Sequence, residues 1–127
     1  MSRPIFDEAL THPAIRDKIG AWGVDVVREV REVVASTPVV VVGMKMNPFP
    51  RKARRLLDAA GVPYRYLEYG SYLSGYRRRL PLKLWTGWQT FPMIFVKGIF
   101  IGGAADLERL MQSGELARRL EDAPGRP

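Results

Sequence analysis

The chain has few side chains that could act as nucleophiles or as metal ligands. Its 127 residues include no cysteine and one histidine, His12. Thiol–disulfide exchange, thiolate zinc sites and iron–sulfur ligation all need a protein thiolate, so the sequence excludes them in their usual form. His12 lies between Thr11 and Pro13 near the amino terminus, where we expect a solvated side chain and no catalytic relay.

Basic side chains are the main chemical feature of the middle of the chain. The formal net charge is +7, from 20 Lys and Arg against 13 Asp and Glu. Residues 43–105 hold eleven Lys or Arg but only two acids, Asp58 and Glu68. This surplus predicts a basic surface that suits an anionic ligand or partner.

Aromatic residues are mixed with basic ones between residues 72 and 88. We favour a solvated helix face here, with Tyr76 and Trp85 partly in the core. A nucleic-acid site is a less favoured alternative, because arginines beside aromatic rings can bind phosphates and stack on bases. An anionic peptide is another, since Arg pairs with carboxylates in bidentate fashion. The residues concerned are Tyr72, Tyr76, Arg77, Arg78, Arg79, Lys83, Trp85 and Trp88.

Asn47-Pro48 is typical of a helix start, with Asn as the N-cap and Pro at the first helical position. The following apolar stripe predicts a helix that ends at Gly61. Before it, Val39 to Val42 form a β-branched run that predicts a strand covered on both faces. The sequence therefore predicts a strand, a turn and a helix start within a few residues.

The remaining elements follow from hydrophobic spacing. Helical periodicity predicts helices over 25–36, 71–84 and 106–120, the last as one or two pieces, and Ile15, Ile19 and Trp22 indicate a short helix or docked arm. Alternation over 64–69 predicts a strand parallel to 39–42, because a helix crosses between them. Lys97-Gly98 predicts a hairpin between 93–96 and 99–101.

Three ordered motifs resemble those of the glutaredoxin family, which has the thioredoxin fold. Asn47-Pro48-Phe49-Pro50 follows the buried strand, where the family has its C-P-Y-C or C-G-F-S active-site turn. Residues 88–98 resemble the W-P-T-(F/V)-P segment and the hairpin after it. Residues 102–107 resemble G-G-(C/S)-D-D-L, and residues 111–116 are similar to the single-cysteine members.

The resemblance implies an α/β fold of the thioredoxin-like kind, with a central mixed four-stranded sheet flanked by helices and an extra N-terminal helical segment. We expect an arm or short helix over 1–24, the glutaredoxin-like domain over 25–120 and a flexible tail over 121–127. The amino-terminal residues form no apolar signal core, and no run approaches the ~18 apolar residues of a membrane helix. We therefore expect a cytoplasmic protein without membrane association.

The family binds glutathione through a lysine before the turn, the main chain before a cis-proline, and the G-G-x-D turn. The resemblance thus implies a cis Phe91-Pro92 peptide and a groove that could hold glutathione or a small anion. Ala105 replaces the family's first aspartate, which predicts weaker recognition of the γ-glutamyl end. The candidate binding residues are Lys45, Asn47, Phe49, Phe91, Pro92, Gly103, Ala104, Ala105 and Asp106.

The active-site turn departs from the family at both reactive positions. Asn47 stands at the nucleophilic cysteine, and Pro50 stands at the second cysteine or serine. A carboxamide cannot attack a disulfide, so we expect no thiol–disulfide oxidoreductase activity and no catalytic residue. We interpret Asn47 chiefly as a helix cap, with a contact between its amide and a ligand as the alternative.

These departures favour a binding module for glutathione, a small anion or a protein partner. An iron–sulfur cluster held in the family's manner is not expected, because it needs a protein thiolate. Two other functions stay open. One is a glutathione-dependent enzyme in which glutathione supplies the thiol, and the other is a nucleic-acid binder that uses the basic surface.

Overall fold

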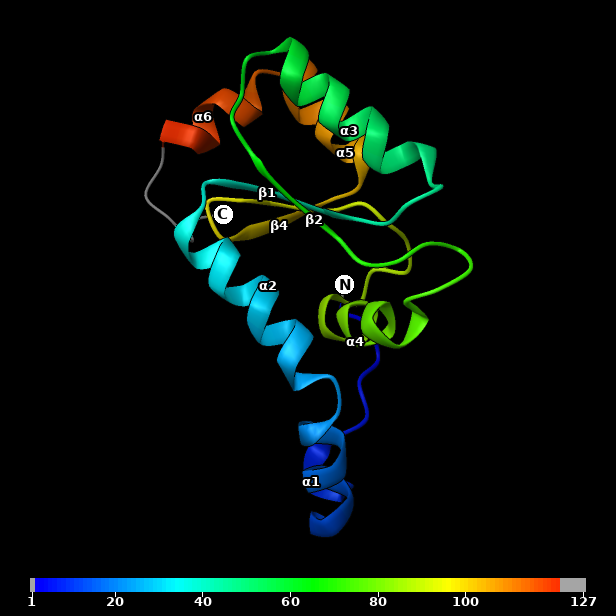
Figure 1. The fold of residues 1–127 in the computed structure, drawn as a ribbon. Helices are drawn as coiled ribbons and strands as arrows, with labels where there is room; N and C mark the ends of the chain where they lie inside the picture. Colours follow the sequence, from blue (N-terminus) through cyan, green and yellow to red (C-terminus); the bar gives the residue numbers. More distant parts are fainter. Residues whose placement is uncertain (1, 122–127) are drawn as a thin grey trace.

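Four strands form one mixed sheet in the order β2-β1-β3-β4 (Figure 1). The computed structural model describes residues 2–121. β1 pairs with β2 in parallel and β3 pairs antiparallel with β4, as predicted, and β1 also pairs antiparallel with β3. The strands are β1 (Val39–Gly43), β2 (Arg65–Glu68), β3 (Met93–Val96) and β4 (Ile99–Gly102).

Helices cover both faces of this sheet, with α3, α5 and α6 on one side and α2 and α4 on the other (Figure 1). A short 3-10 helix and α1 precede them. The helices are η1 (Glu8–Leu10), α1 (Pro13–Ala21), α2 (Val24–Ser36), α3 (Pro48–Ala59), α4 (Tyr76–Thr86), α5 (Ala104–Gln112) and α6 (Glu115–Glu121).

β1 is the centre of the fold, because its alternate side chains enter two separate cores. Val40 and Val42 pack with the side chains of α2 and α4. Val39 and Val41 pack with those of α3 and α5. All four valines are buried, which confirms the prediction of a strand covered on both faces.

The amino-terminal segment contributes no side chain to either core. α1 projects away from the sheet (Figure 1), and neither η1 nor α1 contains a buried residue. His12 has a local structural role here, since its Nδ1 accepts a hydrogen bond of 3.1 Å from the Ala14 N–H and caps α1. Of the two alternatives for this segment, a short helix or a docked arm, the structure has the helix, with Trp22 directly after its end.

The prediction for the segment 71–84 was partly wrong. The helix begins at Tyr76 and ends at Thr86, and it continues through Pro81. Residues 70–75 instead form a closed loop. Gly70 and Gly75 both have positive φ, and a Cβ at Gly70 would lie 2.7 Å from the Gly75 Cα. This close backbone approach needs glycine, and the left-handed conformation of Gly75 places the helix start after it.

Two side chains of α4 also differ from expectation. Tyr76 was expected partly in the core but is 58% exposed. Arg79 was assigned to a solvated face but is only 6% exposed. Its Nη1 donates hydrogen bonds to the carbonyl oxygens of Tyr69 at 3.1 Å and Ser74 at 2.6 Å. Main-chain acceptors, which periodicity cannot reveal, account for the burial of this arginine.

Within residues 2–121, no helix is both long enough and apolar enough to cross a membrane. The tail predicted over 121–127 begins at Glu121, which is the last residue of α6. The remainder of that tail lies outside the described residues.

Candidate functional site

The turn between β1 and α3 is organised by Asn47. The Asn47 Oδ1 accepts a hydrogen bond of 3.0 Å from the Phe49 N–H. Asn47 is therefore the N-cap of α3, as predicted. Its Nδ2 donates to the carbonyl oxygen of Phe91 at 3.2 Å. The side chain is 6% exposed, so both ends of the amide are used inside the protein.

The partner of Asn47 lies in the segment before β3. The Phe91-Pro92 peptide is cis, as the resemblance implied. Phe91 is buried, and the Asn47 amide links its carbonyl oxygen to the start of α3. The main chain before the cis-proline and the start of α3 are therefore fixed relative to one another.

The start of α5 supplies a third segment. Asp106, in the first turn of α5, accepts a hydrogen bond of 2.9 Å from the Gly103 N–H through Oδ2. Its Oδ1 accepts from Arg109 Nη2 at 3.1 Å. The N–H groups of the first turn of a helix have no acceptor within the helix, and they carry partial positive charge. This end of α5 can therefore receive a carboxylate.

These segments meet around one pocket with a volume of about 220 Å³. Larger hollows of about 370, 380 and 490 Å³ lie elsewhere, but they contain none of the predicted binding residues. The pocket is lined by Phe49, Trp88, Thr90, Phe91, Pro92, Gly103, Ala104, Ala105 and Asp106. The fold thus brings together residues from three separate segments, of which Phe49 is far from the other two in sequence.

Known proteins similar to this chain identify its family. The glutaredoxin family profile matches residues 33–101. A glutaredoxin-like protein of Dictyostelium discoideum is 41% identical over 107 residues, which cover 84% of this chain and 87% of that protein. The chain belongs to the glutaredoxin family. Rice glutaredoxin-C4, named as chloroplastic, is 33% identical over 96% of this chain and 86% of its own length.

Solved glutaredoxin structures share the fold. Reduced glutaredoxin C1 from Populus tremula x tremuloides gives a TM-score of 0.71 at 27% identity, covering 86% of this chain and 98% of that one. A buckwheat glutaredoxin, solved in complex with glutathione, gives a TM-score of 0.70 at 25% identity, covering 78% and 90%. This glutaredoxin therefore has the thioredoxin-like fold.

Two of the nine predicted binding residues do not line the glutaredoxin pocket. Asn47 lies behind it, where its amide bonds to Phe91 and Phe49. Lys45 is exposed, and its backbone N–H donates to the Gly70 carbonyl at 2.7 Å. The main chain at Lys45 thus fixes the loop before α4, and its side chain is not among the residues that line the pocket.

The pocket also includes two residues that sequence reasoning did not assign to it, Trp88 and Thr90. Trp88 packs edge-on against Phe100, with ring centroids 5.6 Å apart. Its buried Nε1 has no hydrogen-bond partner within the described residues. Both residues belong to the motif that ends in Phe91-Pro92, and this position in the sequence was the signal that could have assigned them to the pocket.

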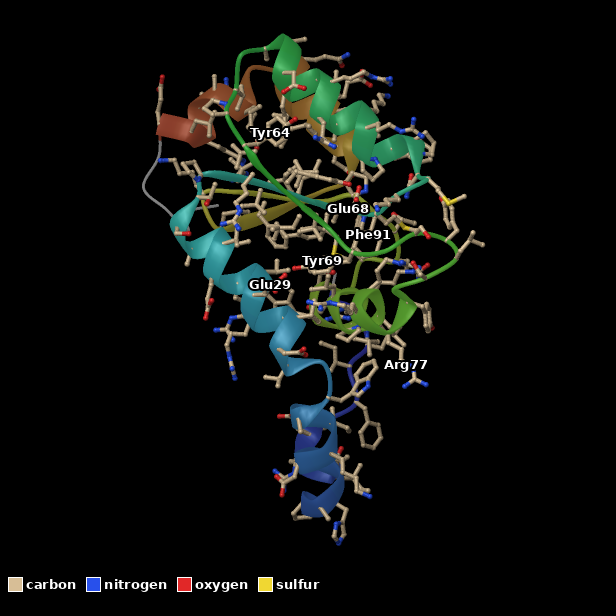
Figure 2. All side chains as sticks on the ribbon, in the orientation of Figure 1. Glu29, Tyr64, Glu68, Tyr69, Arg77 and Phe91 are labelled. Atoms are coloured by element: carbon tan, nitrogen blue, oxygen red, sulfur yellow. The ribbon has the colours of Figure 1, made fainter. Side chains whose placement is uncertain are left out.

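A polar cluster outside the pocket joins α2, α4 and Tyr69, the residue that follows β2. Figure 2 shows Glu29 and Tyr69 facing each other, and the Tyr69 hydroxyl donates to a Glu29 carboxylate oxygen. Arg78 Nη2 lies 3.7 Å from the other oxygen of Glu29. Burial, followed by the Glu29 hydrogen bond, raises the pKa of Tyr69 well above its usual value.

The edge of the sheet near β2 has a similar tyrosine. Burial raises the pKa of Tyr66 to about 12, and the hydrogen bond to Glu68 acts in the same direction. Arg54 lies over the Tyr66 ring, with its Cζ 4.1 Å from the centroid. These interactions consolidate the packing of α3 on β2 and do not reach the pocket.

The part of the chain described by the structure contains no set of side chains that could ligate a metal ion. Residues 2–121 contain no group of three or more His, Asp or Glu side chains arranged to hold an ion. The sequence has no cysteine, so the residues at the active-site turn do not fit an iron–sulfur cluster ligated in the family's manner.

Proposed function

We propose that this glutaredoxin binds glutathione, or a small anion of similar chemistry, in the pocket between the α3 start, the cis Phe91-Pro92 segment and the α5 start. The observation that carries the proposal is the pocket itself. Its lining combines seven residues that the family resemblance had assigned to ligand binding. The buckwheat relative solved with glutathione supports glutathione as the ligand to test.

The chemistry of the pocket suits a tripeptide with carboxylate ends. The α5 start offers N–H groups and partial positive charge to a carboxylate. The main chain at Phe91 can hydrogen-bond to a peptide backbone, and the exposed Phe49 ring supplies an apolar wall. Ala105 has no charged group for the γ-glutamyl ammonium, so we expect weak binding.

We further propose that this binding occurs without thiol–disulfide exchange by the protein. Such exchange needs a thiolate that attacks sulfur, and the chain has none. The amide of Asn47 is also engaged on both sides, so it presents no group for covalent chemistry. By the same reasoning, we propose that no iron–sulfur cluster is bound in the family's manner.

A calorimetric titration with reduced glutathione tests this function. Ala105 is an exposed residue on the rim of the pocket, so Ala105→Trp should fill the pocket and weaken binding by about tenfold, or ~1.4 kcal/mol. Ala59→Trp, at the exposed far end of α3, is the matched control and should bind as the unmodified protein does. No saturable heat with the unmodified protein, or equal affinity in both variants, would contradict the proposal.

A further inference from the structure

Five large apolar side chains are exposed around the active-site turn and the loop before α4. They are Met46, Phe49, Tyr72, Leu73 and Tyr76, and Leu73 is the most exposed at 85%. Together with the charged Lys45 and Arg77, we call them the turn–loop surface. A cluster of this kind is a recognised mark of an interaction site, whereas single exposed apolar residues are ordinary.

The main chain holds the two segments of this surface together. The Lys45 N–H donates to the Gly70 carbonyl at 2.7 Å, which attaches the turn to the base of the loop. Both segments lie on the same side of the molecule (Figure 1). Met46 has a positive φ of 66°, a conformation that non-glycine residues rarely adopt, and its side chain is exposed.

The loop is held in shape from within. Ser71 and Ser74 form a two-residue bridge, with N–O distances of 3.0 and 3.3 Å. The buried Arg79 donates to the Ser74 carbonyl at 2.6 Å. The loop tip, Tyr72-Leu73, is therefore presented to solvent by a braced backbone. Such pre-organisation lowers the entropy cost of binding a partner.

The charged side chains of the turn–loop surface, Lys45 and Arg77, are both positive. Residues 44–57 and 69–105 contain no Asp or Glu. Lys45 and Arg77 are exposed, and neither forms an ion pair among residues 2–121. Figure 2 shows Arg77 directed away from α4. The neighbouring Arg78 and Arg79 differ, because they bind Glu29 and loop carbonyls respectively.

We propose that the turn–loop surface docks a protein segment that is acidic and carries apolar side chains. Removal of the exposed apolar groups from water favours docking. The unpaired positive charges favour an acidic partner and speed its association. The surface meets the ligand pocket at Phe49, and its other residues lie outside the lining of that pocket.

Peptide display on the immobilised full-length protein tests this proposal without a known partner. Selection from a random peptide library, with saturating glutathione present, should enrich sequences that combine Asp or Glu with Phe or Leu. A synthetic peptide of the enriched sequence should then bind about tenfold more weakly to Leu73→Ser and to Lys45→Glu. Both side chains are exposed and make no side-chain hydrogen bond within the described residues, so both variants should fold.

Matched controls come from the amino-terminal segment. Leu10→Ser removes another exposed leucine, and Lys18→Glu reverses the charge of another exposed lysine. Both should leave peptide affinity unchanged. Leu73→Ser should also leave glutathione binding unchanged, which separates this proposal from the proposed function.

Three results would overturn the proposal. One is a selection without enrichment of acidic and apolar residues. The second is an enriched peptide that binds Leu73→Ser as tightly as the unmodified protein. The third is a single-stranded oligonucleotide that binds through Lys45 and Leu73 when no selected peptide does, which would assign the surface to nucleic acid.

Discussion

The side-chain amide of Asn47 joins the start of α3 to the main chain of Phe91. Its Nδ2 donates to the Phe91 carbonyl oxygen at 3.2 Å, while its Oδ1 accepts from the Phe49 N–H at 3.0 Å. In the resemblance to the family, this position belongs to the nucleophilic cysteine. Where the family has a reactive group, this chain has one that braces two walls of the pocket.

The two hydrogen bonds of Asn47 can be separated by substitution. Asn47→Ser keeps a capping oxygen but loses the bond to Phe91, so we expect a loss of about 1 kcal/mol in the free energy of unfolding. Asn47→Ala loses both bonds and should cost about 2 kcal/mol. Denaturant unfolding measures both values. Equal stability of Asn47→Ser and the unmodified protein would show that the Phe91 bond contributes nothing.

A cysteine at position 47 tests whether the start of α3 would still favour a thiolate. Asn47→Cys places a thiol at the α3 N-terminus, where the helix dipole and free N–H groups favour a thiolate. The thiol pKa should fall below the ~8.5 of a free cysteine, at a cost of about 1 kcal/mol in stability. The pH dependence of alkylation by iodoacetamide measures this pKa. A cysteine introduced at exposed Ala59 is the control, and equal pKa values at the two sites would contradict the expectation.

Arg79 should matter more to stability than its neighbour Arg77. Arg79→Met removes two hydrogen bonds from a buried guanidinium to the carbonyls of Tyr69 and Ser74. We expect a loss of about 2–3 kcal/mol and faster amide exchange in residues 70–75. Arg77→Met, on the exposed face, should change stability by less than about 0.5 kcal/mol. Similar losses in the two variants would argue against the role of Arg79 as a loop brace.

Some of this arrangement was predictable from sequence and some was not. The burial of the β1 valines on both faces and the Lys97-Gly98 hairpin were predicted, because local sequence patterns determine both features. The cis Phe91-Pro92 peptide was implied by the family motif. The burial of Arg79 was missed because its partners are backbone carbonyls of a folded loop. The place of Trp88 in the pocket was missed although the residue belongs to the Phe91-Pro92 motif, because its packing on Phe100 is a contact between segments that spacing does not reveal.

Stability should fall at alkaline pH because two tyrosines resist ionisation in the fold. The pKa of Tyr66 is raised to about 12, and that of Tyr69 is also raised. A raised pKa of this kind stabilises the fold fully below the ordinary tyrosine pKa of ~10, and the contribution is lost as the pH rises through the folded value. Thermal unfolding across this range measures the slope. Tyr66→Phe should flatten it, and an unchanged slope in that variant would count against the assignment.

The most direct measurement of the central claim is an amide NMR titration of the full chain with glutathione and, separately, with S-methylglutathione. We predict saturable shifts at the amides of Phe91, Ala104, Ala105 and Asp106, which line the pocket. Both ligands should bind equally well, because the protein has no thiol with which the ligand sulfur could react. Shifts confined to Arg77 and its neighbours, or none that saturate, would contradict a retained glutathione pocket.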